Sequence, residues 1–175
     1  MKTQFIHDQH QLTGVRGTYG PLGNVAANGC GSVALYNLYQ LLGCPVAYEE
    51  LLEEIGRGWF FRTMLAGLWG TSPWYVIRRL GKLKDVRLRY YWYRGRQRQE
   101  QKIGCHSFFL YLYIYPFGAH YTVGDARGSR LVVYNDTCRS GCLSGYYREV
   151  RALGMLVIGI EKIPFWSCAP AKKRL

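Results

Sequence analysis

The spacing of apolar residues changes along this chain, and that change constrains the fold more than any other feature. Residues 30–82 carry apolar side chains at helical spacing, whereas from Asp85 onward apolar and polar side chains alternate as in strands. The first part predicts helices over residues 30–42, 48–55 and 74–80. The second part predicts strands over residues 86–93, 106–115, 120–123 and 131–134, with a last strand pair or one long strand within 150–163. Helices followed by antiparallel strands predict an α+β fold, with N-terminal helices packed on a C-terminal antiparallel sheet.

Length and composition fit one folded domain. The chain has 175 residues, 49% of them apolar and 15% aromatic, so we expect a single domain over residues 1–175. Its first residues lack the apolar segment of a signal peptide, and no apolar stretch reaches the roughly 18–20 residues of a membrane span. We therefore expect a cytoplasmic protein, without a membrane partner, whose six cysteines are reduced.

A metal site is the alternative use of the cysteines. Cys138 and Cys142 form a CxxxC pair that could be half of a zinc site. No second Cys or His pair with ligand spacing accompanies it, and the four histidines are scattered. We therefore expect no metal and no cofactor.

The net charge of +12 is concentrated in one segment. Residues 78–102 contain ten basic and two acidic residues and so contribute +8. Such a segment can be a solvated face, with Arg87 and Arg89 pointing outward from a strand, or it can attract an acidic partner. Since no nucleic-acid-binding motif accompanies the charge, we favour the solvated face and regard nucleic acid as an unlikely partner.

Cys30 is the candidate nucleophile. It follows a loop of small and turn-forming residues, has Gly29 and Gly31 as neighbours, and precedes an apolar helical run that Gly43 ends. The pattern places the thiol at a helix N-terminus, where free backbone N–H groups favour the reactive thiolate. The alternative is that Cys30 is a small buried apolar residue, as most free cysteines are.

His120 is the candidate base, because it opens a strand whose hairpin partner ends in Asn135 and Asp136. One of those two side chains can orient the imidazole. An even hairpin register would place Asp136 on the face of His120, and an odd one would place Asn135 there. We predict Asp136, because a carboxylate also stabilises the imidazolium that forms during attack, and we keep Asn135 as the alternative.

These residues, in this order, resemble the papain-like cysteine peptidases. Asn28-Gly29-Cys30-Gly31 opens a helix, His120 opens a strand, and Tyr134-Asn135-Asp136 ends the next strand. The likeness is greatest to the branch of bacteriocin-leader (double-glycine) peptidases, which carry an oxyanion glutamine six residues before the cysteine and an aspartate sixteen after the histidine. Here Asn24 and Asp136 occupy those positions, and Thr137 stands where that branch usually has proline.

The resemblance implies a papain-like two-layer fold, a bacterial protein, and hydrolysis of a peptide or protein substrate. It implies that Cys30 attacks a carbonyl with His120 as base, while Asn24 and the Cys30 backbone N–H stabilise the oxyanion. Nothing in these residues separates hydrolysis from acyl transfer by an amidase, a deamidase or a transglutaminase. A non-catalytic basic binding module on the same fold is the remaining alternative.

Overall fold

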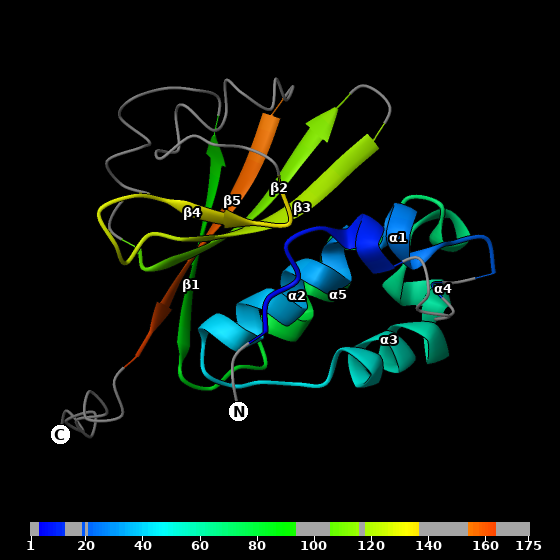
Figure 1. The fold of residues 1–175 in the computed structure, drawn as a ribbon, viewed down its shortest axis with the longest axis horizontal. Helices are drawn as coiled ribbons and strands as arrows, with labels where there is room; N and C mark the ends of the chain where they lie inside the picture. Colours follow the sequence, from blue (N-terminus) through cyan, green and yellow to red (C-terminus); the bar gives the residue numbers. More distant parts are fainter. Residues whose placement is uncertain are drawn as a thin grey trace, which may run out of the picture.

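A layer of helices covers one face of an antiparallel sheet in the computed structural model of the chain (Figure 1). The structure describes residues 4–12, 19, 21–93, 106–115, 118–136 and 154–163. Its helical elements are η1 (Gln9–Leu12), α1 (Val25–Asn28), α2 (Cys30–Leu41), α3 (Tyr48–Arg57), α4 (Trp59–Arg62), η2 (Leu65–Gly67) and α5 (Pro73–Leu80). Its strands are β1 (Val86–Tyr93), β2 (Phe108–Tyr115), β3 (Gly118–Asp125), β4 (Val132–Tyr134) and β5 (Gly154–Lys162). The predicted α+β class is confirmed.

The sheet has the order β1-β5-β2-β3-β4, and every neighbouring pair is antiparallel. β5 lies between β1 and β2, so the end of the described chain returns to the middle of the sheet. Of the two predictions for residues 150–163, the described part forms one strand. β1 is an edge strand, and Arg87 and Arg89 are exposed on it, as the alternation predicts. The rest of the basic segment, from Arg94 to Lys102, lies outside the described residues.

α2 is the central helix of the core. Val33, Ala34, Leu35 and Leu38 are fully buried, because the helix has the sheet on one side and α3 on another. It contacts β3 most extensively, which brings the beginning of the helix to the strand that carries His120. Across the described ranges of the chain, neither this helix nor another is long and apolar enough to cross a bilayer.

α3 packs one face on this core and turns the other to solvent. Leu51, Leu52 and Ile55 are buried, whereas Glu53 is exposed. Glu54 is half-buried. It lies toward α5 and pairs with Arg79 there, an interaction between distant residues that periodicity along one helix cannot reveal.

Candidate active site

Cys30 is the first residue of α2, as predicted, and its glycine neighbours are required by close packing. A Cβ atom on Gly29 would collide with the backbone carbonyl of Val25. A Cβ atom on Gly31 would collide with the side chain of Thr71. At both positions next to the cysteine, therefore, only glycine, which has no Cβ atom, leaves room for the neighbouring atoms.

The thiol of Cys30 is buried, and burial raises its pKa above the ordinary value. The backbone N–H groups of Tyr121, Gly31 and Cys30 itself lower that pKa, but by less than burial raises it. The helix start thus favours the thiolate, as the sequence predicts, yet the thiol keeps its proton at neutral pH. A base must remove that proton before the sulfur can react.

His120 lies on β3 opposite Tyr113, and the two rings are 5.2 Å apart. The pair lies on one face of the sheet, and Tyr121, the next residue, packs on the other face in the core that contains Cys30. Burial lowers the pKa of His120, while the Asn135 carbonyl and the Asp136 charge raise it by less. The imidazole is therefore neutral at pH 7 and able to accept a proton.

Cys30 and His120 line the same cavity, which has a volume of about 530 Å³. The walls that the helical layer and β2 contribute are largely apolar: Met64, Leu68, Trp69, Leu112 and Ile114. No hydrogen bond joins the thiol to the imidazole. Such bonds are often long in unliganded enzymes and shorten when substrate binds. The structure thus brings the predicted nucleophile and base to one cavity without direct contact.

The hairpin register is odd, because Val123 pairs with Tyr134. Under that register the strand would direct Asn135 to the face of His120. Asn135 instead leaves the strand with φ 62°, and its backbone carbonyl lies 3.1 Å from His120 Nε2. Its side chain turns away to Gln9. Asp136 acts on His120 through its charge, and its carboxylate accepts a hydrogen bond of 2.7 Å from the Tyr113 hydroxyl.

Asn24 lies apart from this cavity. It is exposed, and its side chain caps α1 by accepting a hydrogen bond from the backbone N–H of Ala26. Asn28 is the asparagine that lines the cavity with Cys30. Its side-chain nitrogen donates to the Leu68 carbonyl at 2.6 Å, which holds the amide against the cavity wall. The structure therefore brings Asn28, and not Asn24, beside the cysteine.

Sequence reasoning missed Gln9, which links the two halves of the site. Gln9 is buried, its side-chain nitrogen donates to the Ala26 carbonyl, and its side-chain oxygen accepts from Asn135. Its backbone N–H donates to the Asn135 side chain as well. Phe5 and Ile6, apolar residues in an otherwise polar N-terminal segment, were the available signal, since both pack against the core.

No group of three His, Cys, Asp or Glu side chains that could hold a metal ion occurs within the described ranges, and Cys138 and Cys142 lie outside them. Comparisons of the chain with protein-family models, with curated proteins and with solved structures found no match.

Proposed function

We propose that the chain is a papain-like cysteine peptidase that hydrolyses peptide bonds through an acyl-enzyme on Cys30. The observation that supports this most is that a cysteine at a helix start and a neutral, half-buried histidine line one cavity. A thiol with a raised pKa needs such a neighbouring base. The resemblance around Asn28–Gly31, His120 and Asp136 points to the same reaction.

The carbonyl of Asn135 determines which nitrogen of His120 serves as the base. A carbonyl oxygen only accepts, so Nε2 at 3.1 Å must carry the proton and donate it to this hydrogen bond. Nδ1 then keeps its lone pair and takes the proton of the Cys30 thiol. Asp136 stabilises the imidazolium that results, because its charge raises the pKa of His120.

The sulfur attacks the carbonyl carbon of the scissile bond, and the carbonyl oxygen becomes an oxyanion. The Cys30 backbone N–H and the Asn28 amide stabilise this oxyanion, the latter in place of Asn24. The C–N bond then breaks, and the imidazolium gives its proton to the leaving amine. Water, deprotonated by His120, adds to the thioester and releases the acid and the free thiol.

A library of peptides tests this proposal. We expect cleavage by the unmodified chain, none by Cys30→Ala, and a rate at least about a hundredfold lower for His120→Gln. Asn28→Ala should lower turnover more than the matched variant Asn24→Ala. Cleavage that survives in Cys30→Ala would refute the proposal.

A non-catalytic module on this fold is the second candidate, and the burial of Cys30 favours it. The side chain is 6% exposed and its pKa is raised, as for a cysteine that only packs. Such a module would cleave none of the library peptides. Acyl transfer would appear in the same assay as an amide product when a primary amine is added.

We also propose a bacterial cytoplasmic location. The resemblance implies a bacterial protein, and Cys30 and Cys44, the cysteines within the described residues, are both free thiols.

A further inference from the structure

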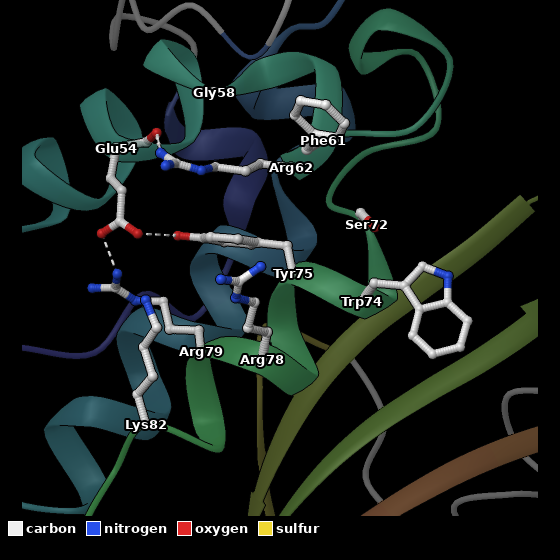
Figure 2. A pocket seen from close by; sticks show the side chains of 10 residues that line it. All are labelled: Glu54, Gly58, Phe61, Arg62, Ser72, Trp74, Tyr75, Arg78, Arg79 and Lys82. Atoms are coloured by element: carbon white, nitrogen blue, oxygen red, sulfur yellow. Dashed lines mark hydrogen bonds and ion pairs between the residues drawn. The ribbon is translucent and has the colours of Figure 1, made fainter.

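A second cavity of about 530 Å³ lies between α3, α4 and α5, outside the site of Cys30. Four of its lining side chains are cations: Arg62, Arg78, Arg79 and Lys82. Among the described residues that line it, Glu54 is the one acidic side chain. Figure 2 shows the four cations on the side of α5 that faces Glu54, with Phe61 at one margin and Trp74 at another.

The cations divide into a fixed pair and a free pair. Arg79 forms an ion pair with the Glu54 carboxylate, and Arg62 donates to the Glu54 backbone carbonyl (Figure 2). Arg78 and Lys82 are exposed, and neither side chain has a hydrogen bond or an ion pair within the part of the chain that the structure describes. They are four residues apart, Arg78 in the last turn of α5 and Lys82 just after the helix ends, and both line the same cavity, so their charges remain available there.

The carboxylate of Glu54 shows how the groups of this cavity bind a carboxylate. One carboxylate oxygen pairs with Arg79, and the other accepts a hydrogen bond of 3.0 Å from the Tyr75 hydroxyl. Within the described lining, four cations accompany this one carboxylate, which leaves an excess of three positive charges. The cavity thus has the groups to bind further carboxylates.

The two cavities share a wall at the beginning of α5. Thr71 and Pro73 line the cavity of Cys30, whereas Ser72 and Trp74 line the basic cavity. Consecutive residues therefore face opposite sides of one short segment. Trp74 is 80% exposed and Phe61 also 80%, so apolar surface borders the cations. The basic cavity therefore adjoins the cavity of Cys30 across this segment.

We propose that the basic cavity binds an acidic segment of a polypeptide, with Arg78 and Lys82 holding Asp or Glu side chains and Trp74 and Phe61 contacting apolar side chains beside them. That this polypeptide is the substrate rests on the proposed function; the binding itself does not. The chemistry selects carboxylates next to apolar residues, at a site distinct from the cavity of the reactive thiol.

Fluorescence anisotropy tests the binding with two labelled peptides of equal length. One contains Glu and Asp beside Leu and Phe, and the other has Gln and Asn in place of the acidic residues. We expect the acidic peptide to bind the unmodified chain and Cys30→Ala equally, and the amide peptide to bind about tenfold more weakly or worse. Arg78→Gln combined with Lys82→Gln should weaken binding of the acidic peptide to the same degree.

The matched control is Lys84→Gln combined with Arg89→Gln, which removes the same charge from exposed residues outside the cavity. We expect it to keep affinity within about twofold. The proposed site would be refuted if both double variants lost affinity equally, or if the cavity variant lost no affinity. Tighter binding of a single-stranded oligonucleotide or of phosphatidylserine vesicles than of the acidic peptide would refute the choice of ligand.

The binding experiment tests the basic cavity, and the cleavage assay tests the proposed function, so each can fail without the other. If Cys30 proves inert while the acidic peptide binds and the cavity variant does not, the peptidase proposal fails and the binding site stands. If peptides are cleaved but Arg78→Gln with Lys82→Gln changes neither binding nor the preference for acidic substrates, the peptidase proposal stands and the binding site is refuted.

Discussion

The nucleophile half and the base half of the candidate site are held in different ways. Cys30 is fixed by close packing, with Gly29 against the Val25 carbonyl and Gly31 against Thr71. His120 is fixed by a polar link that runs from the N-terminal segment, through the Asn135 carbonyl, to the ring. The packing contacts of the first half join residues 4 and 40 positions apart, whereas the link between Gln9 and Asn135 in the second half joins residues 126 positions apart. Substitutions in the two halves should therefore affect stability and turnover to different extents.

The largest effect should distinguish the two neighbours of His120. We expect Asp136→Asn to lower turnover about a thousandfold, because it removes the charge that stabilises the imidazolium. Asn135→Ala should change turnover only several-fold, since its backbone carbonyl remains, while it lowers stability through the lost bonds to Gln9. Steady-state kinetics on both variants check this, and the reverse order would assign the role to the Asn135 side chain.

Packing around the nucleophile half should show in stability. Gly29→Ala should lower the free energy of unfolding by about 3 kcal/mol, because the new Cβ meets the backbone carbonyl of Val25, which cannot move aside. Gly118→Ala is the control, since nothing lies within 4 Å of its Cβ position. Chemical denaturation should show a change below about 0.5 kcal/mol there. Equal stability of the two variants would contradict the packing account.

The polar link of the base half should be more tolerant. Gln9→Ala should lower the free energy of unfolding by about 2 kcal/mol, because the Ala26 carbonyl and the Asn135 amide lose a buried partner. Turnover of the folded variant should also fall, as the Asn135 carbonyl loses its support. Gln11→Ala, an exposed glutamine on the same segment, should change neither. Unchanged turnover in Gln9→Ala would separate Gln9 from the site.

The smallest effect concerns pH. Burial lowers the pKa of His120 in the folded chain, so the unfolded chain binds this proton more readily. The stability that neutral His120 provides is complete above the ordinary histidine pKa of about 6.5 and decreases as the pH falls below it. Denaturation between pH 7 and pH 5 should show a decline that is shallower in His120→Gln. An identical decline of stability in both proteins would show that His120 does not contribute to this pH dependence.

The sequence predicts the elements of this fold well, because helical and strand periodicity are local. The start of α2 at Cys30, the left-handed Gly43 after it and the β3–β4 hairpin all follow from neighbouring residues. The sequence does not predict the half-buried Glu54, which depends on Arg79 from another helix.

Within the candidate site, too, local features could be predicted from the sequence, whereas features that depend on distant residues could not. The position of Cys30 could be predicted, but the net rise of its pKa could not, since burial depends on the whole core. The strand parity argument for Asp136 or Asn135 fails at the end of β4, because Asn135 adopts φ 62° and leaves the strand. The role of Gln9 could not be predicted, because its partner Asn135 lies 126 positions away in the sequence.

In the proposed mechanism, Cys30 forms a covalent acyl intermediate with the help of His120. Incubation with an activated peptide ester, followed by intact-mass measurement and peptide mapping, tests it most directly. We expect one acyl group on Cys30 in the unmodified chain, none in Cys30→Ala, and acylation at least about a hundredfold slower in His120→Gln. Acylation of the exposed Cys44 in place of Cys30, or an equal rate in His120→Gln, would contradict the account.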